Sequence, residues 1–469
     1  MSYLFNTDDD RKAMLQAIGA ESIEELFRSI PAETQLSRPL NLPAAMGELE
    51  LQQHVQALAS QNQNVVDYCC FLGGGAYDHF VPAVVDEIAS RGEFYTSYTP
   101  YQPEVAQGNL QAMFEYQTMI CQLTGLDVSN ASLYDGGSAA VEAVLMAISV
   151  TRRSKVVTCD TVHPHYRQIL ATYLQSLDAE LVVLPATDGV VSLEQLQACV
   201  DDTTACVLIQ SPNFLGSLED VAAIAELVHQ HKGLLVTVFD PIGTGILARP
   251  GDQGADIAVA EGQTLGTPLL FGGPYLGIMA CREGLVRRLP GRIAGQTVDR
   301  KGRRCWVLTL QTREQHIRRE KATSNICTNQ GLFALRATIF LSTLGPQGLA
   351  DTARLCLRKA HYAARRLTDG DRFSLAFEAP TFKEFVVRDR ENRVGELLQT
   401  ALEQKIFAGI PLGTWYPDLA DCFLVAVTEK RTRDEIDRWA NCLQTGTAAP
   451  LPAKNGSTTV SNPPASQHA

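Results

Sequence analysis

The chain has 469 residues, of which 45% are hydrophobic, and its formal net charge is −12 at pH 7. This length and composition allow one large hydrophobic core and a smaller second one. The acidic balance argues against a nucleic-acid or anionic-membrane surface, because both need clustered Lys and Arg. The start MSYLFNTDDDRKAML lacks a basic region followed by an apolar stretch, and no uninterrupted run of about 18 apolar residues occurs. We therefore expect a cytoplasmic protein whose partners are small molecules or other proteins.

The first 63 residues are expected to form a helical segment, because apolar residues recur at helical spacing over residues 8–18, 22–27 and 48–61. From residue 64 the pattern changes. A Gly-rich stretch, FLGGGAYDHF, is followed by a helical VPAVVDEIAS, by an aromatic loop, YTSYTPYQPE, and by a long helix over residues 109–123.

Between residues 131 and 280, short β-branched runs alternate with helical patterns. SLYDGG, KVVTCD, ELVVLP and ACVLIQSPN are each followed by such a pattern, and LLVTVFD follows the last one. This alternation predicts right-handed βαβ units and a mostly parallel sheet covered on both faces. We expect a three-layer α/β domain over residues 64–329, a small α+β domain over 330–445 and, from its polar composition, a disordered tail over 446–469.

Two features of the residue pattern bear on metals and disulfides. Seven of the twelve cysteines lie in apolar segments without regular spacing, which is typical of reduced thiols in a long chain; these are Cys69, Cys70, Cys121, Cys159, Cys199, Cys206 and Cys281. His163 and His165 look like a pair of metal ligands, but no cysteine or carboxylate at ligand spacing accompanies them. We expect neither disulfides nor a metal site.

The stretch YDGGSAAVEA places Gly136, Gly137 and Ser138 between an apolar run and a helix. Backbone N–H groups at such a helix start can close on a phosphate, and the serine hydroxyl adds a further donor. A plain strand-to-helix turn capped by Ser138 explains the same residues. The motif alone leaves both interpretations open.

Asp240 follows the apolar run GLLVTVFD, at the edge of the predicted sheet where open α/β sheets bind ligands. Pyridoxal phosphate enzymes place a carboxylate there against the pyridinium nitrogen, because a protonated ring is a better electron sink. A turn cap at the end of a strand is an equally good explanation of this residue alone.

In such enzymes the Schiff-base lysine follows the aspartate by roughly two dozen residues. No lysine occurs between Lys232 and Lys301, and Gln263 stands where it is expected. An amide cannot form an imine, although the glycines after Gln263 resemble the loop that follows the lysine. We therefore predict a fold-type I pyridoxal-phosphate transferase-like domain whose own site, with Gly136, Gly137, Ser138, Asp240 and Gln263, is vestigial.

Several strings resemble the glycine dehydrogenase (decarboxylating) family, and in particular its separate N-terminal subunit. They are FLGGGAYDHFVPAVVDEI, YTSYTPYQPEVAQGNLQAMFEYQ, LYDGGSAAVEA, EGQTLGTPLLFGGPYLG, RREKATSNICTNQ and GIPLGTWYPDL, and the resemblance extends to about residue 445. It implies a glycine cleavage system enzyme in which pyridoxal phosphate, held by a lysine-bearing sister subunit, decarboxylates glycine. The aminomethyl group would then pass to the lipoyl arm of the H-protein. An α2β2 assembly is expected.

Under that resemblance, this chain can contribute to catalysis only from across the subunit interface. The aromatic loop, residues 95–102, offers Tyr95, Tyr98, Tyr101 and Gln102 as candidate catalytic groups. Thr323, Ser324 and Asn325 are candidate contacts to the cofactor phosphate. A packed interface loop and a helix N-cap region, respectively, remain alternative explanations.

Three further questions stay open from the sequence. The family resemblance implies that a role in stacking on the cofactor is open to His163 or His165 in the degenerate pocket. The basic residues Arg303, Arg304, Arg313, Arg318, Arg319 and Lys321 form either a solvated face or a surface for an acidic H-protein. Finally, the chain can be an independent homodimeric pyridoxal-phosphate lyase or transferase that uses Lys232 or Lys321, or a non-catalytic scaffold that keeps the fold.

Overall fold

The computed structural model describes residues 5–36, 38–327 and 329–447. The chain divides into two compact units, residues 1–63 and residues 64–469. The tail predicted to be disordered lies outside the described residues, apart from Gly446 and Thr447.

The first unit consists of short helices: α1 (Asp8–Ala17), the 3-10 turns η1 (Glu24–Phe27) and η2 (Ala32–Thr34), and α2 (Glu48–Ala59). Thr7 caps α1 in a reciprocal capping box with Asp10. The helices predicted over residues 8–18 and 48–61 are confirmed, whereas residues 22–27 form only a 3-10 turn. None of the described residues in these helices is buried, so the apolar side chains of this unit, such as Leu26, Phe27, Leu49 and Leu51, are exposed.

The second unit is built on a seven-stranded sheet, as the alternating pattern predicts. In spatial order its strands are β2 (Val128–Ser129), β8 (Gly277–Cys281), β7 (Ile257–Glu261), β6 (Leu234–Phe239), β5 (Thr204–Ser211), β3 (Lys155–Cys159) and β4 (Glu180–Leu184). The five strands from β7 to β4 are parallel, and β8 is antiparallel to both of its neighbours. The mostly parallel α/β sheet is thereby confirmed.

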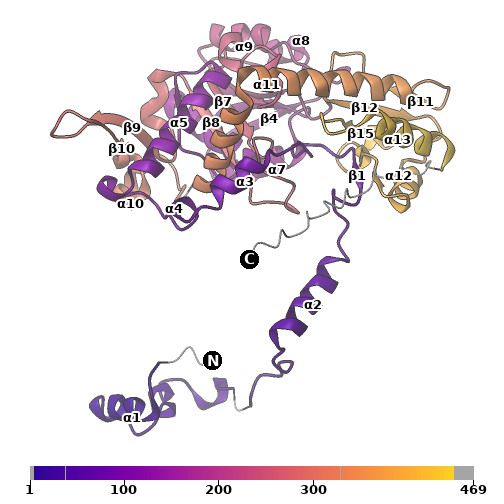
Figure 1. Cartoon of the computed structure of the whole chain (residues 1–469). Helices are drawn as coiled ribbons and strands as arrows, with labels where there is room; N and C mark the ends of the chain where they lie inside the picture. Colours follow the sequence, from indigo (N-terminus) through magenta and orange to yellow (C-terminus); the bar gives the residue numbers. More distant parts are fainter. Residues whose placement is uncertain (1–4, 37, 328, 448–469) are drawn as a thin grey trace, which may run out of the picture. The chain divides into compact units, whose positions relative to one another are not determined.

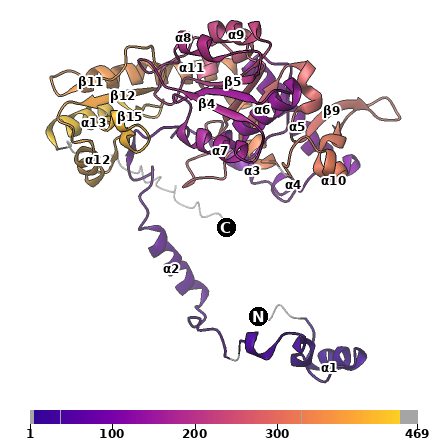
Figure 2. The same cartoon turned by 180° about the vertical axis from the view of Figure 1, so that it is seen from behind.

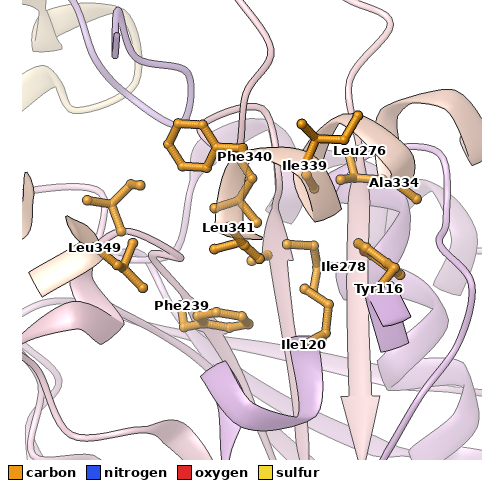
Figure 3. Packing of buried hydrophobic residues seen from close by; sticks show 14 of the residues in the cluster. Tyr116, Ile120, Phe239, Leu276, Ile278, Ala334, Ile339, Phe340, Leu341 and Leu349 are labelled. Atoms are coloured by element: carbon orange, nitrogen blue, oxygen red, sulfur yellow. The ribbon is translucent and has the colours of Figure 1, made fainter. Parts of the chain in front are cut away.

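Helices cover both faces of this sheet, and neighbouring strand residues show which face each helix covers. Ile257 and Val259 of β7 pack with α6 (Gly136–Thr151) and α7 (Pro164–Leu174). Ala258 and Ala260 pack on the opposite face with α3 (Ala83–Ala89), α5 (Gln107–Thr124) and the first part of α11 (Gly331–Leu367). Figure 3 shows this second cluster, in which Tyr116 and Ile120 of α5 lie near Ile278 of β8.

The helices α8 (Leu193–Cys199) and α9 (Val221–Gln230) pack against alternate residues of β5 and β3. Figure 2 shows them on one side of β4, with α7 on the other. Helices on both faces leave the strands almost wholly apolar, which is why the sheet residues read as β-branched runs and not as alternating patterns.

A second, smaller core lies at the far end of α11. The four-stranded antiparallel sheet has the order β11 (Phe373–Leu375), β12 (Glu384–Asp389), β15 (Cys422–Ala426) and β14 (Ile410–Pro411). It packs with α12 (Val394–Glu403), α13 (Arg433–Thr445) and the last turns of α11, which thus belongs to both cores (Figure 1). Gly345 has non-helical torsion angles and precedes Pro346, so α11 is interrupted within the part that packs on the large core.

The smaller core also holds the start of the second unit. Strand β1 (Cys69–Cys70) pairs in parallel with β13 (Ile406–Phe407). The next residue, Phe71, stacks on Trp439 of α13 at 4.8 Å between ring centroids. The segment that carries the Gly-rich stretch is therefore fixed beside β12 and β15.

The structure also bears on two broader predictions. All twelve cysteines lie within the described residues and all are unpaired, as predicted. Among the described residues, no helix combines the length and the apolar composition needed to cross a membrane.

Trp439 generates the first testable prediction. Its side chain is fully buried, and its indole N–H donates to the Ala408 carbonyl at 3.0 Å. We expect Trp439→Ala to lower the free energy of unfolding by about 3–5 kcal/mol, because it removes a large buried ring and leaves a cavity. Trp439→Phe, which keeps the contact with Phe71, should cost less. Urea denaturation measures both, and a loss below about 1 kcal/mol for Trp439→Ala would contradict this account of the core.

Candidate functional site

The residues predicted to form a vestigial site meet at the carboxyl edge of the parallel strands. Asp240 directly follows β6, and Gln263 lies two residues beyond the end of β7. The amino terminus of α6, at Gly136, contacts the end of β7 through Glu261. The structure therefore brings Asp240 and Gln263 together with the Gly136–Ser138 turn, which lies more than 100 residues earlier in the chain.

Asp240 forms a buried ion pair with Lys383, which is the residue before β12. The Lys383 Nζ lies 2.6 Å from Asp240 Oδ2, and the two side chains are 2% and 10% exposed, respectively. The other oxygen, Oδ1, accepts from the backbone N–H groups of Ile242 and Gly243. Burial alone would raise the pKa of Asp240, but the Lys383 ammonium outweighs this effect and lowers that pKa below its usual value.

Two rings complete the surroundings of the Lys383 ammonium. Its Nζ lies 3.5 Å from the centroid of the Tyr77 ring, a close cation–π contact. It also lies 3.2 Å from His79 Nε2, while His79 Nδ1 is 2.6 Å from Glu429 Oε2. These contacts fit a neutral imidazole that donates from Nδ1 to Glu429 and accepts from Lys383 at Nε2.

Glu384, the neighbour of Lys383, ties β12 to the Gly-rich stretch. It accepts from the Gly74 backbone N–H and from the Tyr77 hydroxyl, both at 2.7 Å. Burial raises the pKa of this carboxyl to about 7. The Glu384 backbone also lies so close to residue 216 that this position requires glycine. Gly216 has a φ of +87°, and a Cβ there would lie 2.3 Å from the Glu384 carbonyl oxygen.

The Gln263 side-chain amide forms hydrogen bonds through both its oxygen and its nitrogen. Its Oε1 accepts from the Tyr77 backbone N–H at 2.8 Å. Its Nε2 donates to the backbone carbonyls of Tyr77 and Thr267, at 3.0 and 2.7 Å. The side chain is buried and held in one orientation, so it acts as a structural bridge and offers no nucleophile.

The N–H groups at the start of α6 already donate to carboxylates. Asp135 is the N-cap and accepts from the Ser138 backbone N–H at 2.7 Å and from its hydroxyl at 2.9 Å. Glu261 accepts from the Gly136 N–H at 3.0 Å. The alternative that Ser138 caps the helix is wrong, because Asp135 takes that position. The strand expected at SLYDGG is also absent from these described residues, where Leu133 makes a single bridge to Gly277.

Glu261 is a second buried acid at this edge. Besides Gly136, it accepts from the backbone N–H groups of Gln263 and Leu276, at 2.9 and 3.0 Å. Burial raises the pKa of Glu261 to about 7 despite these donors. The sequence analysis did not identify Glu261, Glu384 or Lys383. The only sequence signal for the latter two is a charged pair, KE, inside the apolar run TFKEFVV.

His163 lies on the opposite wall of the site and stacks on Tyr166, with ring centroids 4.7 Å apart. Its Nε2 is 2.7 Å from the Gly74 carbonyl, and its Nδ1 accepts from the His165 backbone N–H. These partners fix the neutral tautomer with the proton on Nε2. Burial, which disfavours the imidazolium, lowers the pKa of His163 to about 4.

The space left inside this site is small. Asp240, Tyr77, His163, Glu261 and Lys383 are among the residues around a hollow of about 30 Å³. That volume suits one or a few water molecules, whereas ligand pockets usually exceed about 300 Å³. An open depression of about 330 Å³ lies outside it, bounded by residues that include His163, His165 and Tyr275.

The aromatic loop lies beside the start of α11, away from the small hollow. Tyr95 ends the short helix α4 (Gly92–Tyr95), and it lines a cavity of about 260 Å³ together with Tyr98, Asn329 and Gln330. Tyr98 is 90% exposed and Tyr95 is 69% exposed. Both phenols therefore face solvent in this chain.

The other two candidates of the loop do not line that cavity. The Tyr101 hydroxyl accepts from Arg292 Nη2 at 3.3 Å, and the Arg292 guanidinium lies over the Tyr101 ring. Gln102 is exposed and precedes the 3-10 turn η3 (Pro103–Val105).

Residues 323–325 form a loop held by backbone contacts. The Thr323 N–H donates to the Arg313 carbonyl at 3.0 Å, and the Ser324 hydroxyl accepts from the Ile326 N–H at 3.0 Å. Asn325 is exposed. The alternative of a helix N-cap region is wrong here, because the next described helix, α11, has its N-cap at Gln330.

The basic residues of this region are not a single solvated face. A hairpin of β9 (Ile293–Val298) and β10 (Arg304–Thr309) carries Arg303 and Arg304 at its exposed end. Arg313, by contrast, is buried and donates to the carbonyls of Leu310 and Gly291. Arg318, Arg319 and Lys321 are exposed.

Comparison with known proteins first identifies the fold. The chain superposes on a glutamate decarboxylase from Lactobacillus brevis with a TM-score of 0.68, covering 90% of this chain and 97% of that one, at 13% identity. This likeness concerns the fold alone. With its mostly parallel sheet and small antiparallel sheet, the chain has the fold-type I architecture of pyridoxal-phosphate-dependent enzymes.

Closer matches then identify the family. The family model described as glycine cleavage system P-protein matches residues 1–443. A probable glycine dehydrogenase (decarboxylating) subunit 1 from Carboxydothermus hydrogenoformans is 54% identical over 443 residues, covering 94% of this chain and 99% of that one. A crystal structure of a glycine decarboxylase (P-protein) in inhibitor-bound form has a TM-score of 0.86 at 41% identity, covering 95% of this chain and all of the other. The chain therefore belongs to the glycine cleavage system P-protein family.

The chain's own pocket does not fit the cofactor of that fold. An internal aldimine needs an amine where Gln263 stands, and a pyridinium nitrogen needs the Asp240 oxygen that Lys383 occupies. The hollow of about 30 Å³ does not hold a phosphorylated pyridine ring.

The environment of His163 generates the second prediction. We expect its imidazole to stay neutral down to about pH 4, whereas an unfolded histidine titrates near 6.5. Because the unfolded chain binds this proton first, the contribution of His163 to stability is complete above about pH 6.5 and declines as the pH falls toward 4. NMR titration of the imidazole resonances measures the pKa. His163→Gln keeps a donor and an acceptor and should lack this pH dependence, and titration of His163 near pH 6.5 would refute the burial argument.

Proposed function

We propose that this chain is the lysine-free subunit of a glycine dehydrogenase (decarboxylating) and that it acts together with a lysine-bearing sister subunit. The observation that carries the proposal is Gln263, a fully bonded amide at the position where this fold otherwise carries the imine-forming lysine. The name of the relative, subunit 1, agrees with a separate partner subunit. We further propose an α2β2 assembly in the cytoplasm.

The proposed reaction belongs to the glycine cleavage system. Pyridoxal phosphate on the sister subunit would supply the electron sink for the decarboxylation of glycine. The aminomethyl group would then be transferred to the lipoyl arm of the H-protein. The chain described here would bind the sister subunit and help to close its site.

The aromatic loop is the proposed contribution of this chain to that site. Fold-type I sites lie at subunit boundaries, so a chain without a lysine can still place side chains in its partner's site. Tyr95 and Tyr98 suit this role because their exposed phenols border one cavity and have no bond to a residue of the chain's core. Tyr101 and Gln102 would support the same loop, and the contact of Tyr101 with Arg292 would orient it. Thr323, Ser324 and Asn325 are proposed to reach the phosphate from the adjoining segment.

The alternative of an independent lyase or transferase requires another lysine near Asp240. Lys232 is exposed and precedes β6, whereas Asp240 follows it, so the length of the strand, about 20 Å, separates them. Lys321 is exposed in the 3-10 turn η8 (Arg319–Lys321). Among the described residues, Lys383 is the only lysine that lines the hollow, and it lies at the carboxylate that the ring nitrogen would use.

Borohydride reduction tests which of the two subunits binds pyridoxal phosphate covalently. The two subunits are purified together, saturated with pyridoxal phosphate, reduced and mapped by peptide mass spectrometry. We expect a stoichiometric pyridoxyl-lysine on the sister subunit and none on this chain. A single fully modified lysine here, at Lys232, Lys321 or Lys383, would overturn the proposal in favour of an independent enzyme.

Tyr98→Phe tests the proposed catalytic contribution. The variant keeps the ring but removes a hydroxyl whose contact with a charged group is worth about 1–3 kcal/mol. We expect normal assembly with the sister subunit and a fall in glycine decarboxylation of about tenfold to a hundredfold. Tyr173→Phe, at a half-exposed tyrosine on α7, is the matched control and should change neither. Full turnover in Tyr98→Phe, Tyr95→Phe and Tyr101→Phe would assign the loop to the interface and favour the scaffold alternative.

A further inference from the structure

Each part of the chain's own pocket that the fold would use for a cofactor is already occupied by a side chain of this protein. Gln263 is bonded to the backbone at Tyr77 and Thr267. Asp240 is paired with Lys383. The N–H groups at the start of α6 donate to Asp135 and Glu261.

Lys383 has the charge of the part that it replaces, and carboxyl oxygens stand where phosphate oxygens would lie. A protonated pyridine ring would bring a positive N–H group to Asp240, and Lys383 brings a positive ammonium there. A phosphate would bring negative oxygens to the start of a helix, and Asp135 and Glu261 bring carboxyl oxygens there. Asp240 and the Gly136 and Ser138 N–H groups therefore have polar partners within the chain.

We propose that Lys383 is an internal substitute for the protonated ring nitrogen of the cofactor, and that it keeps this chain's pocket closed to pyridine ligands. Its ammonium neutralises Asp240, and the Tyr77 ring lies directly against it. The inference concerns the chain's own pocket, so it holds whether or not the aromatic loop serves a partner subunit.

Because of its position, Lys383 has a second effect besides replacing the ring nitrogen. Asp240 directly follows β6 of the large sheet, whereas Lys383 directly precedes β12 of the small sheet and Glu384 is the first residue of that strand. Glu384 binds the Gly74 N–H and the Tyr77 hydroxyl on the large-domain side of the same contact. Two adjacent residues where β12 begins thus fasten the small sheet to the site. Neither charge is tolerated alone in such surroundings, because an unpaired buried ion is strongly destabilising.

Lys383→Ala tests the proposal through ligand binding. Removing the side chain leaves a space beside a free Asp240 carboxylate, and 3-hydroxypyridine, the ring skeleton of the cofactor, is the probe. With the full-length chain, we expect saturating 3-hydroxypyridine to raise the Tm of Lys383→Ala by about 2–5 °C. The wild-type chain and Lys383→Ala/Asp240→Asn should shift by less than about 1 °C.

Two controls make the result specific. Lys359→Ala removes a different lysine, which is partly buried and donates to the Glu429 backbone and not to Asp240, and it should gain no response to the probe. Phenol resembles the probe in size but offers no pyridinium N–H, so it should not stabilise Lys383→Ala. An equal response of the wild-type chain, or no response of folded Lys383→Ala, would overturn the proposal.

A second measurement decides the question if Lys383→Ala does not fold. We expect Lys383→Met to lower the Tm by on the order of 5 °C or more, because it leaves the buried Asp240 carboxylate unpaired. Adding Asp240→Asn to Lys383→Met should restore most of that loss, since the charge itself is then removed. If Lys383→Met kept the wild-type Tm, or if Asp240→Asn restored nothing, the two charges would not depend on each other and the proposal would fail.

Discussion

A carboxylate at the end of β6 and an ammonium at the start of β12 meet inside the protein at 2.6 Å, almost completely shielded from water. Each group would be costly to bury alone, so each fixes the position of the other. Beside this contact, the Lys383 ammonium lies against the Tyr77 ring and the His79 imidazole. The Glu384 carboxylate accepts from the Tyr77 hydroxyl. The relation between the two sheets, the path of the Gly-rich stretch and the closed state of the pocket all depend on this pair.

This arrangement separates two tasks that pyridoxal-phosphate enzymes usually combine. The inner pocket is filled by side chains that pair with one another, such as Asp240 and Lys383, and it serves the stability of the fold. The exposed phenols of Tyr95 and Tyr98, beside the start of α11, have no such role within the chain. In the function proposed above, such a P-protein family member offers this exposed surface to a catalytic neighbour, while its own site has become part of the core.

The sequence predicts the features that depend on local patterns. The alternation of apolar runs and helices is sufficient for the parallel strands, and the absence of a lysine around Gln263 is visible directly. The sequence does not identify Asp135 as the N-cap of α6, because Asp and Ser are both good N-caps and only the geometry distinguishes them. Lys383 and Glu384 were missed for a different reason. Their partners Tyr77 and Asp240 lie more than 140 residues away, and the local pattern of apolar and polar residues does not predict a contact over such a distance in the chain.

The Asp240–Lys383 pair also bears on how the family could change. An ancestral pocket with a bound ring could lose its lysine in one step, because an amide at residue 263 finds backbone partners. The reverse path is longer. With a lysine restored at residue 263, Asp240 would still be paired with Lys383, and losing Lys383 first would leave a buried carboxylate without a counter-charge. Each single step toward a cofactor-binding state passes through a less stable protein, so evolution by one substitution at a time favours keeping the two subunits specialised.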